Sequence, residues 1–150
     1  MRLRHGWLVA LLIVTGLAFL ACTRTSTETR NGSDPAKVEP IEGTDVGRVT
    51  LSSDAAQRLD VQTAPVRELR DGHGGRARMV IPYAAVLYDP SGDTWAYTNP
   101  APLVFVRARI SVDHIEGSHA FLSSGPPPGT EVVTVGASEL LGVEYRVGGE

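Results

Sequence analysis

The stretch at residues 103–113 reads LVFVRARISVD, and its alternation of side chains decides the fold. The even positions from Val104 to Val112 carry aliphatic side chains, whereas the odd positions carry Phe105, Arg107, Arg109 and Ser111. Successive side chains of a strand point to opposite faces of a sheet, so this period of two predicts a half-buried strand. The two arginines then share one face, which is either solvated or a docking face for an acidic partner.

Shorter strand patterns and turn signals lie on both sides of this segment. An extended segment at 60–69 carries Pro65, which restricts it to a sheet edge or a bulge. The sequence DPSGD at 89–93 predicts a turn, and NPAP at 99–102 is expected to end the strand before it. The other candidate strands are 46–52, 77–88, 94–98, 119–124 and 131–135.

Two short helices complete the predicted elements. Ser53 or Asp54 can cap a helix that continues through residues 55–59, and ASELL at 137–141 can add a helical turn. The sum predicts a small, mostly β domain of about six short strands with one or two short helices, arranged as a roll, a barrel or a sandwich.

Composition narrows the class of protein. The chain has 150 residues, which is room for one ordinary domain. Its 16 glycines and 10 prolines favour turns and short strands. The basic residues are scattered without interleaved aromatics, which gives nucleic-acid binding little support. Cys22 is the only cysteine, so no internal disulfide can form.

Residues 1–21 have the pattern of a signal peptide. Arg2, Arg4 and His5 form a positive start, and no residue from Trp7 to Ala21 is charged. This apolar run is shorter than the roughly 20 residues that a membrane helix needs. It matches the apolar region of about 7–15 residues that secretory signals carry.

Ala21-Cys22 at the end of this segment resembles the lipobox of bacterial lipoproteins. The resemblance implies that Cys22 carries a diacylglyceryl group and, after cleavage, a further acyl chain such as palmitate on its new amino terminus. Phe19 and Leu20 stand where that family has Leu and a small residue. Three outcomes are open: a lipidated Cys22, an uncleaved membrane anchor, and ordinary secretion.

The chain after Cys22 divides into two parts. Residues 22–45 are rich in Thr, Ser, Glu, Gly and Pro, so we expect a flexible tether. The folded domain is expected at 46–150. Cleavage removes Arg2 and Arg4, which leaves 14 − 2 = 12 basic and 17 acidic residues and a formal charge of −5. Membrane attachment would therefore depend on lipid chains rather than on charge.

An ordered set of motifs spans residues 80–145. These motifs are Ile81-Pro82, Ala85-Val86, WAY at 95–97, FVRAR at 105–109, and GTEVVTVGASEL at 129–140. Their order and spacing resemble the membrane-proximal domain of periplasmic adaptors, the membrane-fusion or HlyD-like subunits of efflux pumps. Val49 to Val66, which includes LSSDAAQRLDVQTAPV, resembles the amino-terminal piece of the same domain, and this implies a membrane-proximal-type β-roll or barrel.

The chain departs from that family between these two pieces. Full adaptors carry a β-barrel, a lipoyl-like domain and usually a helical hairpin there, whereas Glu68 to Met79 span only about a dozen residues. Loop length is entropically cheap to change, so a short loop can close the gap. The turn at Gly125–Pro128 is also stiffer than the Gly-Leu of the family.

The resemblance implies a non-enzymatic envelope lipoprotein that docks on a membrane transporter or efflux system. Its location would be extracytoplasmic, and Arg107 and Arg109 are the candidate docking residues. The alternatives are a metal- or ligand-binding envelope module and a truncated remnant of a full adaptor. No cofactor is expected.

Other constellations give weaker signals. His73, His114 and His119 lack metal-ligand spacing, and Ser123, His119 and Asp113 lack any nucleophile motif. GHGG at 72–75 lacks the Lys-Ser/Thr of a phosphate loop, so it is expected to be a turn. Three aromatic residues can form either an exposed patch or cross-strand packing, and packing is favoured; they are Trp95, Tyr97 and Phe105.

Overall fold

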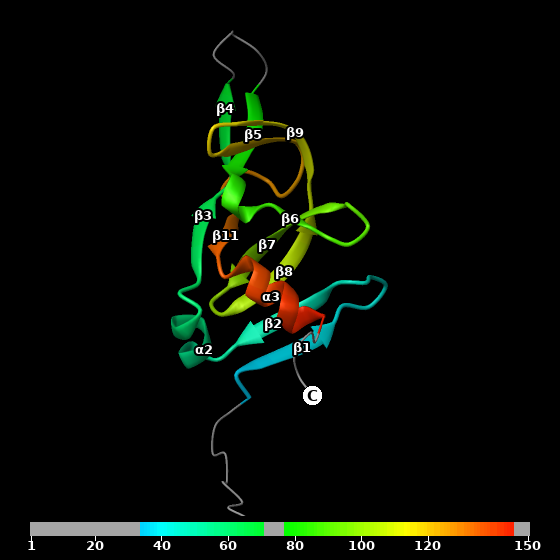
Figure 1. Ribbon diagram of the computed structural model, residues 1–150, viewed down its shortest axis with the longest axis vertical. Coiled ribbons are helices and arrows are strands. Elements are labelled where there is room, and N and C mark those ends of the chain that lie inside the picture. The colour runs from blue at the N-terminus through cyan, green and yellow to red at the C-terminus, as the bar shows by residue number, and fades with distance from the viewer. Residues whose placement is uncertain (1–33, 71–76, 146–150) are drawn as a thin grey trace, which may run out of the picture. The chain divides into compact units, whose positions relative to one another are not determined.

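The computed structural model describes residues 34–70 and 77–145 (Figure 1). All of them belong to the second of two units into which the chain divides, at 1–31 and 32–150. The predicted signal peptide, Cys22 and His73 lie outside the described residues. The elements are, in chain order, β1 (Ala36–Pro40), β2 (Gly47–Leu51), α2 (Ser53–Arg58), β3 (Gln62–Pro65), β4 (Arg67–Arg70), β5 (Ala77–Pro82), the 3-10 helix η1 (Tyr83–Ala85), β6 (Leu87–Tyr88), β7 (Thr94–Ala101), β8 (Val104–Arg109), β9 (Ser111–Glu116), β10 (His119–Ser124), β11 (Glu131–Val135) and α3 (Ala137–Glu144).

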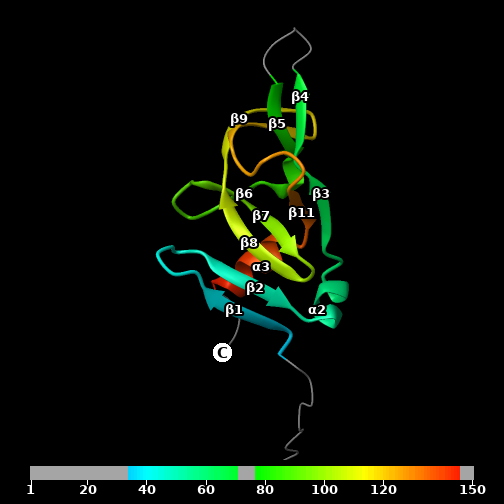
Figure 2. The same ribbon diagram turned by 180° about the vertical axis from the view of Figure 1, so that it is seen from behind.

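The strands form two open antiparallel sheets. The larger sheet has the order β1-β2-β8-β7-β11-β3, with β6 paired to β7, and the smaller has the order β4-β5-β10-β9. Seen from behind, β8 lies between β2 and β7, and α3 lies on the far side of these strands (Figure 2). The predicted mostly β class with two short α-helices is confirmed, and both sheets have free edges.

One extended segment passes from the larger sheet to the smaller. β3 pairs with β11, and β4 pairs with β5. Val66 joins them: its amide donates to the Thr130 carbonyl at 2.8 Å, and its own carbonyl accepts from the Gly129 amide at 2.8 Å. Pro65, which has no amide hydrogen, is the last residue of β3 and so closes an edge strand, as the sequence predicts.

Hydrophobic clusters lie on both faces of the larger sheet. One hydrophobic cluster joins it to α2 and α3 and includes Leu51, Tyr97, Val133 and Leu140. A second cluster contains residues from both sheets, among them Ile81 and Val132. Val132 and Val133 are adjacent in β11 and enter different clusters, because neighbouring side chains in a strand point to opposite faces.

The helix ends differ slightly from prediction. Ser52, one residue before the expected caps, accepts the amide of Ala55 at 3.2 Å and starts α2. α3 extends beyond the predicted single turn, from Ala137 to Glu144. The predicted turn at 89–93 is confirmed: the Asp89 carboxylate accepts the amides of Ser91 and Asp93, each at 2.9 Å.

The predicted tether contains a strand, which corrects its boundary. β1 pairs along its whole length with β2, although residues 22–45 were expected to lack structure. Ala36 and Val38 pack against the first cluster. Backbone pairing with an existing strand and two small apolar contacts are enough to order a segment whose composition is otherwise polar. The folded part therefore begins at Ala36 or earlier, not at Val46.

The predicted break at 99–102 is also wrong in its position. β7 continues to Ala101, with a register shift between Thr98 and Ala101 where Pro100 cannot donate to the ladder. The Asn99 side-chain amide donates to the carbonyls of Ala101 at 2.7 Å and Val104 at 2.9 Å. The turn itself falls at Leu103, whose φ is 63°.

Candidate functional site

Arg107 lies in the interior of the domain. Its exposed fraction is 4%, whereas the side chain of Arg109, two residues later, is 61% exposed. The sequence left this face as either solvated or a docking face; Arg107 is not solvated, and because its side chain is buried, Arg109 is the exposed one of the two candidate docking residues. The reason is that α3 covers this face of β8, so Phe105 and Arg107 point toward the helix and the valines occupy the partly buried opposite face.

A buried carboxylate at the end of α3 pairs with this arginine. The Nε of Arg107 donates to both oxygens of Glu144, at 2.9 and 3.0 Å, and the two side chains are 1% and 4% exposed. The Gly47 amide donates to Glu144 Oε1 at 2.8 Å, and the Tyr97 hydroxyl donates to Oε2. We call Arg107, Glu144, Tyr97 and Gly47 the Glu144 cluster.

Further contacts hold the guanidinium of Arg107 in place. Its Nη2 donates to the Asp45 carbonyl at 3.2 Å, whereas its buried Nη1 has no hydrogen-bond partner among the described residues. The guanidinium carbon lies 4.5 Å from the centre of the Trp95 ring and 5.1 Å from that of Tyr145. Both distances fit cation–π contacts, which strengthen when water is excluded.

The cluster shifts two ionisation equilibria. Burial, together with the hydrogen bond to Glu144, raises the pKa of Tyr97. Burial opposes the charge on Arg107, but the hydrogen bond and attraction of Glu144 outweigh it and raise the pKa of Arg107. Tyr97 therefore keeps its proton and Arg107 its charge. The geometry joins α3, the β1–β2 hairpin and the β7–β8 hairpin, which is a structural role.

The aromatic residues singled out in the sequence pack as expected. Trp95, Tyr97 and Phe105 have exposed fractions of 7%, 0% and 3%. Trp95 donates its indole NH to the Asp89 carboxylate at 3.0 Å, which ties the 89–93 turn to the sheet. The ring of Trp95 also lies 5.5 Å from the guanidinium carbon of Arg109, which forms an ion pair with Asp93.

The two described histidines lie at different register positions of the β9–β10 pair, with His119 opposite Glu116 and His114 opposite Phe121. His114 stacks on Phe121, with ring centres 4.5 Å apart, and its Nδ1 lies 2.9 Å from Asp113. The hydrogen bond from His114 and the charge of Arg78 hold the pKa of Asp113 below its usual range. Within residues 34–70 and 77–145, no group of three His, Cys, Asp or Glu side chains could hold a metal ion.

The residues considered for a nucleophilic site are engaged elsewhere. The hydroxyl of Ser123 donates to the Ser111 carbonyl at 3.2 Å, and Asp113 bonds to Arg78 and His114. His119 lies at the start of β10 and contributes to a groove instead. The arrangement supports no catalytic assembly of Ser123, His119 and Asp113.

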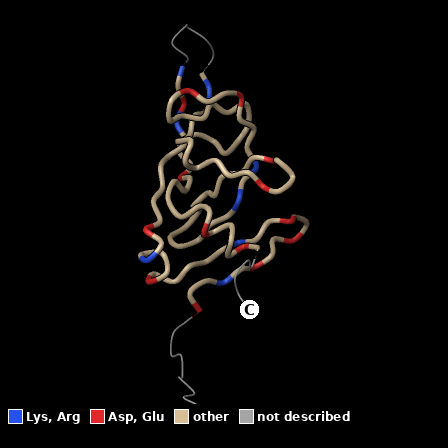
Figure 3. Tube along the Cα trace, in the orientation of Figure 1, with Lys and Arg blue, Asp and Glu red and all other residues tan. Residues whose placement is uncertain are grey.

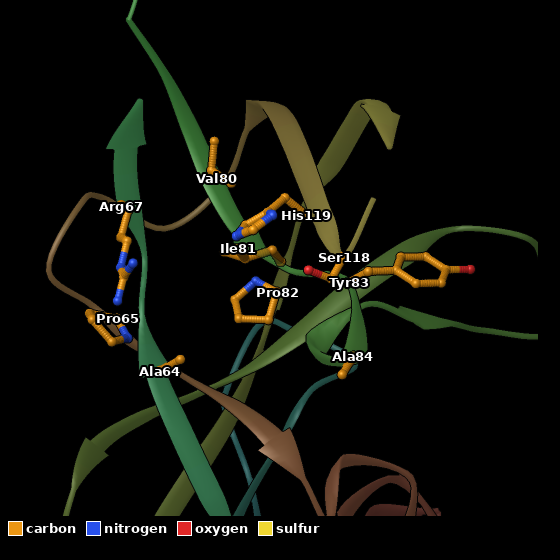
Figure 4. Close-up of a pocket in the computed structure, with 10 residues that line it drawn as sticks. All are labelled: Ala64, Pro65, Arg67, Val80, Ile81, Pro82, Tyr83, Ala84, Ser118 and His119. Atoms are coloured by element: carbon orange, nitrogen blue, oxygen red, sulfur yellow. The ribbon is translucent and has the colours of Figure 1, made fainter. Parts of the chain in front are cut away.

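A groove of about 500 Å³ lies where the β3–β4 segment changes sheets. Ten residues line it, all drawn in Figure 4, and most of the lining is apolar. In Figure 4, Pro82 lies near the centre of the view, with Arg67 to its left and His119 above it. The sequence carried no signal for this groove, because Arg67 and His119 are far apart in the chain and meet only through the pairing of β4 and β10 with β5.

The described charges form no extended patch. Figure 3 shows Lys and Arg at separate places along the trace, with acidic residues between them. Neither described helix has both the length and the apolar character that crossing a bilayer requires.

Comparison with known proteins gives a distant structural neighbour. No protein-family model and no curated protein matches the sequence. One similar solved structure is an NMR structure of 180 residues of SilB from Cupriavidus metallidurans CH34, which contains its N-terminal metal-binding site and its membrane-proximal domain. The identity is 20% and the TM-score is 0.43; the match covers 69% of this chain and 66% of that one.

Proposed function

We propose that the chain is a non-enzymatic, lipid-anchored protein of the bacterial cell envelope whose β domain docks on a membrane transporter, as an adaptor-like accessory module of an efflux system. The observation that carries this proposal is the ordered set of adaptor-like motifs. Half of their residues are buried, and Ile81, Ala85, Phe105, Val132 and Leu140 are at most 3% exposed. The resemblance therefore concerns the residues that build the fold.

The arrangement of the two motif-bearing segments gives further support. The amino-terminal piece supplies β2 and β3, and these pair with β8 and β11 of the later piece. One domain is thus assembled from both segments, as the family resemblance implies. The described loop ends at Arg70 and Ala77 are adjacent partners in the β4–β5 ladder, so a short connection suffices.

Attachment through Cys22 is the first part of the proposal to test. Replacing Cys22 by Ser is expected to move most of the protein from the membrane fraction to the soluble fraction, or to leave it as an unprocessed precursor. The matched control is Thr25→Ser, which should remain processed and membrane-bound. Fractionation and intact-mass measurement check both. An unprocessed wild-type chain whose membrane retention is unchanged by Cys22→Ser would contradict lipidation.

Docking is the second part, and Arg109 is the residue we propose for it. A photo-cross-linking amino acid at position 109 is expected to give a discrete adduct containing an integral membrane transporter, identified by mass spectrometry. The same amino acid at Arg58, an exposed residue of α2, is the control and should give at least about fivefold less of that adduct. Equal labelling from both positions, or none from 109, would remove Arg109 from the docking surface.

Two observations bear on the alternative functions, a binding module and a part of a larger adaptor. The described residues bring no metal-ligand set together, so a ligand is the better-supported form of the binding-module alternative, and the groove is its candidate site. A neighbouring reading frame that encodes the missing barrel and hairpin would favour a split adaptor over a stand-alone module.

A further inference from the structure

The groove at the sheet crossing has the composition of a binding site for one kind of ligand. Its volume of about 500 Å³ lies within the range of small-molecule sites. Ala64, Pro65, Ile81 and Pro82 supply apolar surface. Such a surface takes an apolar molecular body and contributes through the area that it removes from water.

The charge of the groove selects the ligand's polar group. Arg67 is the one Lys or Arg side chain among the residues that line it, His119 is the strand partner of Pro82, and no acidic residue is among the lining residues. Glu131 and Glu116 are strand partners of Pro65 and His119, but neither lines the groove. Arg67 is exposed and forms no ion pair with any described residue, so its guanidinium is available to an anion.

The backbone of the groove disfavours a peptide strand as the occupant. Pro65 and Pro82 have no amide hydrogen to offer. β5 is an inner strand between β4 and β10, so its backbone groups are engaged on both sides; β3 is an edge strand that pairs only with β11, and its last residue beside the groove is Pro65. A peptide laid here would find few partners for its own amides and carbonyls, whereas a small molecule with an apolar body needs none.

We propose that this groove binds a small amphiphilic organic anion, with its apolar body against Pro65, Ile81 and Pro82 and its anionic group on Arg67. This goes beyond docking on a transporter, because the groove and Arg109 are separate features. It assigns the chain a ligand class, an organic carboxylate, sulfonate or phosphate ester, in addition to a partner.

The test uses the full chain in nanodiscs of zwitterionic lipid and 2-naphthalenesulfonate as the probe. Isothermal titration, corrected with empty nanodiscs, is expected to show saturable binding by the wild type. Arg67→Gln should raise the dissociation constant about tenfold, because it removes a charge-assisted hydrogen bond to the sulfonate. Arg70→Gln is the matched control: it removes the same charge from the same strand, but Arg70 does not line the groove. Its dissociation constant should change by less than about twofold.

Two further measurements test whether the probe binds in the groove and whether binding requires its negative charge. Ala84→Trp adds a large ring to the groove wall and should abolish binding, with an unchanged thermal transition as proof of folding. The neutral analogue 2-naphthalenemethanol should bind at least about tenfold more weakly than the sulfonate. No saturable sulfonate binding, equal losses in Arg67→Gln and Arg70→Gln, or equal binding of the neutral analogue would each overturn the proposal. The cross-linking test at Arg109 is independent, so failure of either proposal can be told from failure of the other.

Discussion

Replacing Glu144 by Ala is expected to lower the free energy of unfolding by about 3–5 kcal/mol, the cost of leaving one partner of a buried ion pair uncompensated. The substitution leaves Arg107 charged in a site where its side chain is 1% exposed. It also removes the acceptor of the Tyr97 hydroxyl and of the Gly47 amide. Urea unfolding followed by tryptophan fluorescence measures the change, because Trp95 stacks on Arg107.

Two variants control this prediction. Glu139→Ala removes an exposed carboxylate from the same helix and should change stability by no more than about 0.5 kcal/mol. The double change Arg107→Met with Glu144→Met should recover the part of the loss that comes from the unpaired charge, since apolar residues of similar size often replace a buried ion pair at little cost, while the Tyr97 hydroxyl and the Gly47 amide still lack their acceptor. A double variant as unstable as the sum of the two single variants would show that the buried charge is not the cause.

Replacing Leu140 by Ala is the second change with a large expected effect, a loss of about 2–5 kcal/mol in the free energy of unfolding. Leu140 is 0% exposed and lies in the cluster that joins α3 to the larger sheet. Removing its side chain costs the transfer free energy of the lost carbons and leaves a cavity, because packed neighbours relax only in part.

The same denaturant experiment checks Leu140→Ala. Ser138→Ala, an exposed change two residues earlier in α3, is the control and should lie within about 0.5 kcal/mol of the wild type. A loss below about 1 kcal/mol for Leu140→Ala would mean that α3 contributes little to the stability of the first cluster.

Local sequence signals predicted most of the elements. Alternation identified β8, the DPSGD turn located the hairpin that follows β6, and the Ser-Asp pair located α2 within one residue. These features depend on neighbours in the chain, so composition and period are sufficient to find them. The positions of the aromatic residues in neighbouring predicted strands likewise predicted the burial of Trp95, Tyr97 and Phe105.

The burial of Arg107 could not be found in this way. Alternation assigns residues to two faces, but it does not say which face another element will cover. α3 covers the face that carries Arg107, and Glu144 of α3 is 37 residues away from Arg107 in the chain. One signal was available: Leu140 and Glu144 are four residues apart and so share a face of a helix. An acidic residue on the apolar face of a helix predicts a buried basic partner.

β1 and the groove were missed for a related reason. Residues 36–40 have the composition of a linker, and only the free edge of β2 gives them a partner. The groove forms because the β3–β4 segment leaves one sheet and joins another, and the sequence of residues 62–70 has no pattern that predicts this change of sheet. Both features depend on pairing across the chain rather than on local preference.

The strand order of the larger sheet has a consequence for the timing of folding. β3, near the start of the domain, pairs in that sheet only with β11, and β2, whose first partner is β1, gains its second partner only when β8 is made. Glu144, at the end of α3, completes the contacts of the β1–β2 hairpin. Such distant pairings form slowly, because the intervening chain must be made before they can close. The larger sheet therefore cannot be completed until β11 has been made, whereas the β1–β2 and β4–β5 pairs join segments that are close in the chain.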